Sequence, residues 1–295
     1  MLHLVFERAP FVGRIQLSKI DSRSVERYKS ERRDQPSGRG GVRRGVGAKT
    51  WPISDPNKLT CPATINRDLA VLSHLLSCAV EWGWIASIPV KIRRFQEQRT
   101  QFEYLTEAEI GHLLAAAVAD SYPQIYAFVY IALHTAMRSG EILLLRREFV
   151  DLAKLQIHLP KAKTGARDVP ISANLEKFLC QWLGSFEGDR SWLFASSSSS
   201  TGHTTDLAKP WRRIIEAAGL ADRLITRHTL RHTAITHLVQ AGVDLPTVQR
   251  VSGHKTFEMV SRYFHQNQQH MQDALDKFDA RIGGGSKVQP NAASG

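Results

Sequence analysis

Apolar residues recur at three- and four-residue spacing over most of this chain, which restricts it to a largely helical fold. The pattern is clearest from residue 65 to residue 80, where Ile65, Leu69 and Leu72 begin a face that Val80 ends. Such a face predicts an amphipathic core helix. Pro89 ends this unit, because a proline disfavours helix at the residue before it.

A second helical region opens at Thr106, three residues before Glu109. These two side chains can satisfy free amide donors at a helix start, the pattern known as a capping box. Further helices are expected at residues 125–134, at 210–215 and after residue 226.

At one place the spacing of apolar residues changes from the helical pattern to the two-residue alternation of a β-strand. Residues 156–159 and 168–171 are predicted to be short strands, with Gly165 in the turn between them. The expected fold class is therefore mainly α with a small β-hairpin or sheet, an α+β arrangement.

At 295 residues the chain is long enough for two domains with separate cores. A stretch at about 34–60 combines glycine and arginine with little packing material, which predicts a flexible basic insertion. The expected organisation is a helical first domain at 1–95 that contains this insertion, a linker at 96–103, a second domain at 104–282 and a disordered tail at 283–295.

Positive charge is concentrated in the first third of the chain. The formal charge is +11, and residues 1–100 hold 18 Lys and Arg against 9 Asp and Glu. Such a field favours nucleic acid or an anionic membrane and speeds encounter without selecting sequence, although a solvated basic surface would have the same composition. The candidate DNA contacts are Arg67, Arg93, Arg94 and Arg167.

The three cysteines are far apart and lack a Cys-x-x-Cys pair, which favours a reducing compartment over a structural zinc site. Glu7 interrupts the N-terminus too early for a signal peptide, and no apolar run approaches the roughly 20 residues that span a bilayer. We expect a cytoplasmic, nucleoid-associated protein with no membrane partner.

Tyr263 is the candidate nucleophile. A helical tyrosine is usually core material, and its phenol, with a pKa near 10, needs cationic neighbours for attack. His228 and Arg231 are three residues apart and can face one cleft, and Arg138 lies near another helix start. Two arginines on one phosphate would stabilise a pentacoordinate transition state without a metal. For Arg138 alone, an ion pair with Glu141 is the plainer interpretation.

Lys163, at the tip of the predicted hairpin, could hand a proton to a departing sugar oxygen, although an exposed turn lysine often has no such role. His228 and His232, four residues apart, suggest zinc. The zinc-protease motif requires Glu where Thr229 stands, however, and no third ligand follows at a familiar spacing. We therefore expect no metal and no other cofactor.

Taken in order, these motifs resemble those of the tyrosine recombinase (phage integrase) family, over roughly residues 60–282. The resemblance rests on a first-arginine box, a lysine hairpin, a His-x-x-Arg box, a Gly-His pair and a tyrosine. In this sequence they are Thr135-Ala136-Met137-Arg138-Ser139-Gly140-Glu141, Lys163-Thr164-Gly165, His228-Thr229-Leu230-Arg231, Gly253-His254 and Tyr263.

The resemblance implies a site-specific recombinase or integrase in which a core-binding domain and a catalytic domain form a C-shaped clamp on DNA. Tyr263 would be the nucleophile that forms a 3′-phosphotyrosyl bond. Arg138 and Arg231 would clamp the phosphate, and Lys163 would donate a proton to the leaving 5′-oxygen. His228 would accept a proton or join the clamp, and His254 would donate a hydrogen bond to the phosphate.

The sequence departs from the family pattern at three positions, with Ala136 in place of a frequent glycine, Thr229 in place of an acidic residue and Ser252 in place of leucine. No separate arm-binding domain is expected, and the first helix of the clamp is expected to be missing.

The resemblance also implies that several copies of the protein assemble on DNA. A stripe of Met271, Leu275, Phe278 and Ile282 resembles a tail helix that docks into a neighbouring subunit. A homotetramer on DNA that is monomeric when free is expected, although the stripe could also pack within its own chain.

Two other functions compete with recombination. A type IB topoisomerase-like enzyme would use the same chemistry on a single duplex. A catalytically silent DNA-binding relative would bind DNA without cleaving it.

Overall fold

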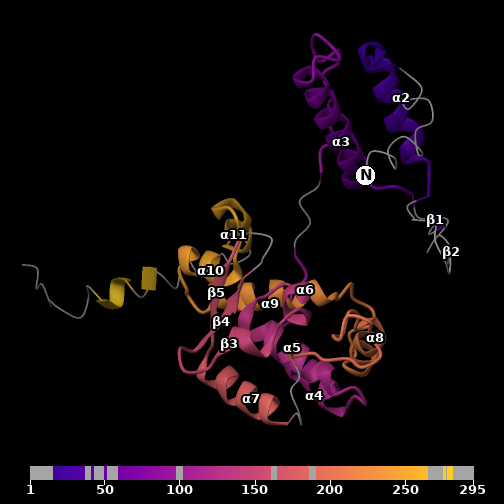
Figure 1. Cartoon of the computed structure of the whole chain (residues 1–295). Helices are drawn as coiled ribbons and strands as arrows, with labels where there is room; N and C mark the ends of the chain where they lie inside the picture. The colour runs from indigo at the N-terminus through magenta and orange to yellow at the C-terminus, as the bar shows by residue number, and fades with distance from the viewer. Residues whose placement is uncertain are drawn as a thin grey trace, which may run out of the picture. The chain divides into compact units, whose positions relative to one another are not determined.

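The computed structural model divides the chain into two compact units, unit 1 at residues 1–100 and unit 2 at residues 101–295. We describe each by itself (Figure 1). The structure describes residues 16–36, 41–42, 50–51, 59–97, 102–160, 165–185, 191–264, 275–276 and 278–281.

Unit 1 is built on two helices that pack side by side, α2 (Ser22–Arg33) and α3 (Pro62–Glu81). The predicted apolar face of α3 is buried against Val25 and Tyr28 of α2. Tyr28 Oη donates to Asp68 at 2.7 Å, which ties the helices together. A short 3-10 helix, η1 (Leu17–Lys19), precedes them.

Helix α2 was not predicted from the sequence. The region after it was predicted to be a flexible insertion, and it differs in part from that prediction. Strands β1 (Gly41–Val42) and β2 (Thr50–Trp51) pair antiparallel inside the segment predicted to be a loop. The rest of that segment lies largely outside the described residues.

The segment after Pro89, at residues 90–95, packs on unit 1. Val90 is buried in the core of unit 1, and Phe95 packs against it. Asn66 pairs with the backbone of Phe95 in both directions, at 2.9 Å and 2.8 Å. The basic residues of this segment are therefore held on unit 1.

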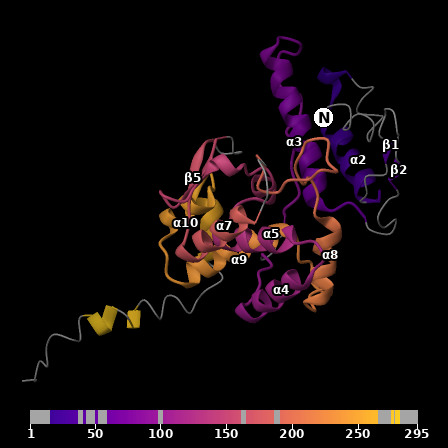
Figure 2. The same cartoon turned by 60° about the horizontal axis from the view of Figure 1, so that its bottom comes forward.

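Unit 2 surrounds a buried helix, α5 (Gln124–Thr135), with further helices and a small sheet. α5 packs along α9 (Arg227–Gln240) and also contacts α4 (Glu107–Ala119) and α7 (Ala173–Gly184) (Figure 2). The remaining helical elements are α6 (Ser139–Leu143), η2 (Arg147–Phe149), α8 (Ala208–Ala217), α10 (Leu245–Ser252) and α11 (Phe257–Phe264).

The predicted hairpin is present, and it forms part of a three-stranded antiparallel sheet with the order β3-β4-β5. Its strands are β3 (Val150–Asp151), β4 (Gln156–Leu159) and β5 (Arg167–Pro170), with Ile157 opposite Val169. The predicted capping box at Thr106 and Glu109 is also formed. The mainly helical α+β fold class is confirmed.

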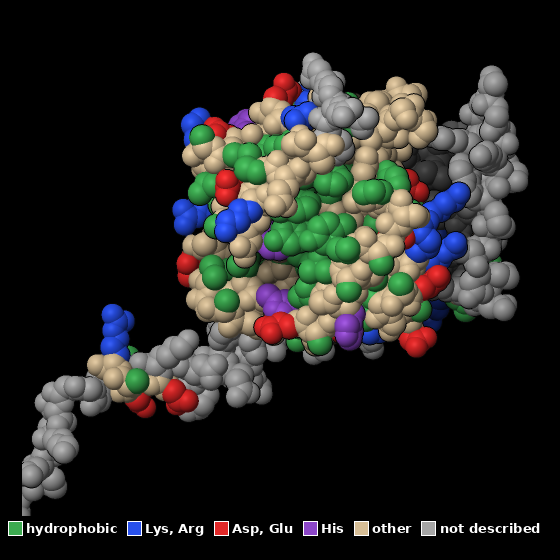
Figure 3. All heavy atoms as spheres, turned by 90° about the horizontal axis from the view of Figure 1, so that it is seen from below, with side chains coloured by type: hydrophobic (Ala, Val, Ile, Leu, Met, Phe, Trp, Pro, Cys, Tyr) green, Lys and Arg blue, Asp and Glu red, His purple; other side chains and the backbone are tan. Residues whose placement is uncertain are grey.

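Unit 2 has two apolar clusters. The larger one covers α5 and the sheet, and the smaller one joins α9, α10 and α11 around Val248, Val260 and Tyr263. On the face seen in Figure 3, hydrophobic side chains gather in the middle and basic side chains lie toward the margins. None of the described helices is long and apolar enough to cross a membrane.

Candidate active site

Helix α9 provides the floor of the candidate site. Thr226 caps its start, and its buried face includes Leu230, Arg231 and Ile235. Arg231 is only 1% exposed, so its guanidinium lies inside unit 2. Its Nη1 donates to the backbone oxygen of Ala136 at 2.7 Å.

That backbone oxygen is available because of the way α5 ends. Ala136 adopts the left-handed conformation, with φ 51°, and forms the C-cap of α5. Two residues later Arg138 is the N-cap of α6. The sharp turn thus brings the Arg231 anchor and the Arg138 side chain to one place.

Glu141 of α6 binds two arginines at once. Its Oε1 accepts from Arg138 Nη1 at 3.0 Å, and its Oε2 accepts from Arg167 Nη2 at 2.7 Å. Burial raises the pKa of this carboxyl, but hydrogen bonds from Arg167 and from Arg138 outweigh it and leave the pKa at about 2. Glu141 therefore stays ionised and fixes both guanidinium groups.

Tyr263 of α11 is 2% exposed. Its Oη lies 2.6 Å from Nδ1 of His232 on α9. Burial raises the pKa of Tyr263 to about 12, although the charges of Arg231 and Arg262 act in the opposite direction. The same cations would stabilise the phenolate formed during attack.

His254 follows the turn that ends α10. Gly253 has φ 65°, and His254 Nδ1 lies 2.9 Å from the buried hydroxyl of Ser252. The rings of His254 and Tyr263 have centroids 6.0 Å apart. Ser252, one of the departures from the family pattern, therefore supports the imidazole directly.

Burial and neighbouring positive charge lower the pKa of several groups in this site. Burial lowers the pKa of Arg231 to about 10, and Arg138 contributes. Burial, with Arg231 and Arg138, also lowers the pKa of His228 and takes that of His254 to about 3. An anion bound among them would offset the effect of the neighbouring cations and raise these pKa values.

Two donors of this cluster have no partner in the part of the chain that the structure describes. Arg167 Nε and Arg231 Nη2 are both buried and make no hydrogen bond. An unsatisfied buried donor of a charged group is costly and requires an explanation, such as a ligand that accepts from it.

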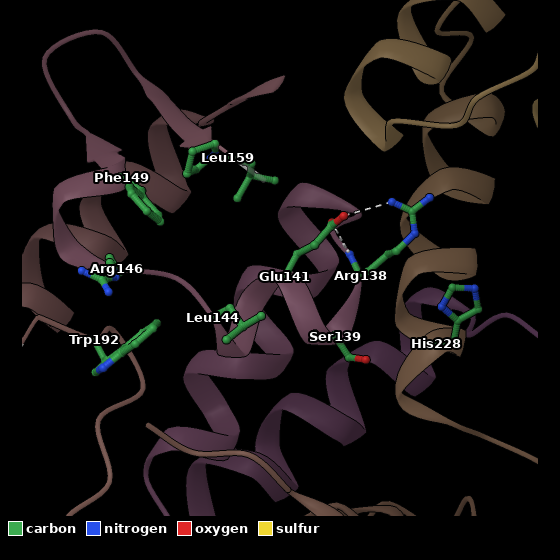
Figure 4. A pocket seen from close by; sticks show the side chains of 11 residues that line it. Arg138, Ser139, Glu141, Leu144, Arg146, Phe149, Leu159, Trp192 and His228 are labelled. Atoms are coloured by element: carbon green, nitrogen blue, oxygen red, sulfur yellow. Dashed lines mark hydrogen bonds and ion pairs between the residues drawn. The ribbon is translucent and has the colours of Figure 1, made fainter. Parts of the chain in front are cut away.

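A cavity of about 610 Å³ opens beside Arg138 and His228 (Figure 4). Figure 4 shows Arg138 bonded to Glu141 at the cavity wall, with His228 on the helix opposite. Its far side is apolar, and Arg146 lies over the Trp192 ring at 4.7 Å. The cavity can accept a group that is partly anionic and partly apolar.

The structure brings five of the six predicted catalytic residues into one site, and the sixth, Lys163, lies outside the described residues. Arg67, Arg93 and Arg94 are exposed on unit 1. Arg167, which is also predicted to contact DNA, is half-buried and pairs with Glu141.

Three contributors to this site were not predicted from the sequence. Glu141 was considered only as an ion-pair partner and His232 only as half of a zinc pair, while Phe102 was not singled out. For His232 a signal existed, because it directly follows Arg231 and lies one turn from His228 on the same helix. Phe102 had no signal, since it is distant in sequence from the groups that it touches.

Comparison with known proteins agrees with this geometry. Residues 103–270 match the model of the phage integrase family. A shufflon-specific DNA recombinase of Escherichia coli is 32% identical over 222 residues, which cover 74% of this chain and 54% of that protein. The integrase of Escherichia phage P2 is 29% identical over 226 residues, which cover 75% and 61%. The chain thus spans between half and two thirds of these relatives' lengths.

Solved structures show the same fold. The Tn1549 transposon integrase in complex with transposon right end DNA is 17% identical with a TM-score of 0.68, over 96% of this chain and 93% of that one. The XerH site-specific recombinase bound to a palindromic difH substrate is 22% identical with a TM-score of 0.60, over 74% and 68%. With more than half of its length matched to the family model and the motif residues gathered in one site, the chain belongs to the phage integrase family of tyrosine recombinases.

Proposed function

We propose that this protein is a site-specific DNA recombinase that cleaves and rejoins DNA through a 3′-phosphotyrosyl intermediate. The observation that carries the proposal is the buried Tyr263 phenol beside the guanidinium of Arg231, whose Nη2 has no partner among the described residues. A phosphate oxygen would satisfy that donor and place the phosphorus near the phenol.

In the proposed reaction, Tyr263 Oη forms a bond to phosphorus and the bond from phosphorus to the 5′-oxygen breaks. Arg138 and Arg231 hold the non-bridging oxygens, which gain charge in the transition state. His228 joins this clamp, and His254 donates a hydrogen bond to the phosphate. Lys163 protonates the 5′-oxygen. A 5′-hydroxyl from a second duplex then attacks the phosphotyrosine and releases Tyr263.

Glu141 and Arg167 support this clamp. The carboxylate orients Arg138 through a hydrogen bond at 3.0 Å. Arg167 shares that carboxylate and lies on β5, so it connects the predicted lysine hairpin to the clamp. Positions held by such ion pairs are more closely defined than those of free side chains.

Double-stranded DNA is the proposed substrate. Unit 1 has most of the net positive charge of the chain, and the structural relatives include recombinases bound to DNA. Arg67, Arg93 and Arg94, all exposed, are proposed to contact the phosphate backbone and to strengthen binding without selecting a sequence. Action on chromosomal DNA would place the protein at the nucleoid of the cytoplasm.

A homotetramer on two duplexes is the proposed working assembly, formed from monomers on DNA. Leu275 and Phe278 lie in a helical segment after α11 and are 52% and 58% exposed. These side chains are available to a neighbouring subunit. The other two residues of the predicted stripe, Met271 and Ile282, lie outside the described residues.

The test uses a nicked suicide substrate made from DNA beside the gene, selected by searching that DNA for short repeats. Wild-type protein is expected to form a covalent adduct with DNA, and Tyr263→Phe is expected to form none while binding the same DNA. Phe264→Tyr in the Tyr263→Phe background is the matched control for a displaced phenol, and it should not restore the adduct. Binding by the wild type without any adduct would overturn the proposal.

A further inference from the structure

His232 is an imidazole in direct contact with the nucleophile, and it is not one of the six catalytic residues assigned above. Its Nδ1 lies 2.6 Å from Tyr263 Oη. It belongs to α9, directly after Arg231 and one turn after His228, and the His228 and His232 rings meet edge to face at 4.7 Å. The site therefore contains three imidazoles, one of which is bonded to the attacking oxygen.

The direction of the hydrogen bond follows from the protonation of its two partners. Burial, with the charges of His228 and Arg231, lowers the pKa of His232 to about 4, so the ring is neutral near pH 7. The phenol of Tyr263 keeps its proton at that pH. In the tautomer of His232 with its proton on Nε2, Nδ1 is free to accept, and the phenol donates to it.

The other groups near Tyr263, His228 and His254 included, make no hydrogen bond to its Oη among the described residues. Arg231 and Arg262 are cations that can stabilise a phenolate but cannot accept from a phenol. The Nδ1 of His254 is already bonded to Ser252, at 2.9 Å. Among the hydrogen bonds of the described residues, His232 is the acceptor that Tyr263 has.

Phe102 packs against the rings of both His232 and Tyr263 and holds them in place. Its ring stacks on His232 with centroids 4.3 Å apart and planes 17° apart, and on Tyr263 at 5.1 Å and 19°. One aromatic side chain therefore covers both partners of the hydrogen bond. This packing restricts rotation of either ring and keeps Nδ1 directed at the phenol oxygen.

We propose that His232 is the proton acceptor for Tyr263, with Phe102 as a positioning residue for the pair. The inference rests on the recombinase function proposed above. As Tyr263 Oη bonds to phosphorus, its O–H bond breaks and the proton passes to His232 Nδ1. The 5′-oxygen leaves with a proton from a different group, Lys163 in the scheme above. In the rejoining step, the imidazolium of His232 returns its proton to the departing phenolate.

Several charged or titratable groups surround this pair, so a pH profile of the wild type alone would not report on His232. They come from α6 and its N-cap, from α9, from α11, from strand β5 and from the turn after α10. These groups are Arg138, Glu141, Arg167, His228, Arg231, His254 and Arg262. The ratio of variant to wild-type rates removes their shared contribution.

Two substitutions separate proton acceptance from positioning. His232→Asn keeps an acceptor atom at the position of Nδ1 but cannot take up the proton, and His232→Leu keeps the volume without any acceptor. We expect His232→Leu to slow adduct formation on the suicide substrate by about 10²-fold or more at pH 7, the usual effect of losing a general base. His232→Asn should be slowed by at least tenfold.

The pH dependence and the leaving group give two further readouts. Hydroxide must take the phenol proton in the variants, so their defect should shrink about tenfold for each pH unit between 7 and 9. A substrate with a 5′-bridging sulfur, which leaves without a proton, should restore Lys163→Ala but leave the His232→Leu defect unchanged.

His237→Leu is the matched control, because His237 lies on the same helix, is half-buried and bonds to the Leu105 carbonyl at 2.8 Å, away from Tyr263. It should cleave as the wild type does. Thermal melting and DNA binding of each variant verify that it is folded.

The inference is overturned if His232→Leu cleaves within threefold of the wild type. It is also overturned if His232→Asn matches the wild type, or if the defect of folded His232→Leu is the same at every pH, since either result assigns His232 a structural role. Failure of the recombinase function would be distinct, because the wild type itself would then form no adduct.

Discussion

Arg231 shows how one side chain serves both the fold and the proposed chemistry. Burial of a guanidinium costs several kcal/mol unless it is paired, and the structure compensates for only part of this through the Ala136 carbonyl. The remaining Nη2 donor is unsatisfied among the described residues. Binding of an anionic phosphate would complete its hydrogen bonds, so DNA should stabilise unit 2 against unfolding.

Glu141 gives a prediction about stability and pH. Its pKa in the folded protein, about 2, lies below its ordinary value of 4.5, so its ionisation favours the folded state above pH 4.5. That contribution, about 3 kcal/mol for a shift of this size, is lost as the pH falls from 4.5 through 2. Glu141→Gln should lower the free energy of unfolding by about that amount at pH 7, and the difference from wild type should vanish near pH 2.

Urea melts of both proteins at pH 7, 5 and 3 measure this difference. Glu148→Gln is the matched control, because Glu148 is an exposed carboxyl whose pair with Arg146 lies at the surface. It should change stability by less than about 1 kcal/mol. A Glu141→Gln penalty that stays constant with pH would show that the carboxylate charge does not contribute.

The identity of the site residues could be predicted from their types and order, because a nucleophile and its cations have few chemical substitutes. The residues that hold these side chains in place, such as Glu141 and Phe102, could not be predicted in this way. Glu141 holds Arg167 across 26 positions of sequence, and Phe102 reaches Tyr263 from the other end of unit 2. Contacts of this kind follow from tertiary packing, which leaves no local periodicity to read.

At the scale of elements, the turn between α10 and α11 is tightly constrained. Gly253 has φ 65°, and a Cβ at this position would lie 2.6 Å from Nε of Arg167. The turn therefore needs glycine both for its conformation and for the side chain that crosses it. The side chain of Arg167, on strand β5, therefore packs directly against the turn that precedes His254.

Gly253→Ala should consequently lower both stability and cleavage. The left-handed conformation costs a non-glycine residue about 1–2 kcal/mol, and the displaced Arg167 adds to this. We expect a loss of about 2 kcal/mol or more in the free energy of unfolding, and a fall of at least tenfold in adduct formation as His254 and Arg167 shift.

Gly242→Ala separates the two effects in this experiment. Gly242 has φ 82° after α9, and its added Cβ would meet no atom within 4 Å. It should lose the conformational 1–2 kcal/mol and keep its cleavage rate. Equal loss of activity in both variants would contradict a specific role for the Gly253 turn.

Elements with a clear apolar period were predicted, whereas α2 was not. Ser22–Arg33 contains many charged residues and few apolar ones, so its helical face is hard to detect. Its buried side includes Lys29 and Arg32, and Arg32 lies 3.5 Å from Asp68 on α3. A helix that packs partly through long polar side chains resembles a solvated basic segment in sequence.

For the whole molecule, the exposed Leu275 and Phe278 give a prediction about assembly. Replacing both with Asp should weaken formation of the complex between two duplexes by tenfold or more, because a charge cannot be buried in an apolar acceptor site. Nicking of a single duplex should be unchanged. Native gels and sedimentation with labelled DNA measure the assembly, and the suicide substrate measures the nicking.

Leu224→Asp is a suitable control for this pair, since Leu224 is 87% exposed in the body of unit 2. It should assemble normally. Normal assembly by the double variant would instead place the tail helix outside the subunit interface.

The anchor of Arg231 has a consequence for how this site tolerates sequence drift. The acceptor is a main-chain oxygen of Ala136, so substitution of that residue's side chain does not remove it. A substitution at position 136 is therefore felt through the shape of the turn rather than through the loss of a functional group. Alanine holds the left-handed conformation at a modest conformational cost and leaves the acceptor of Arg231 in place.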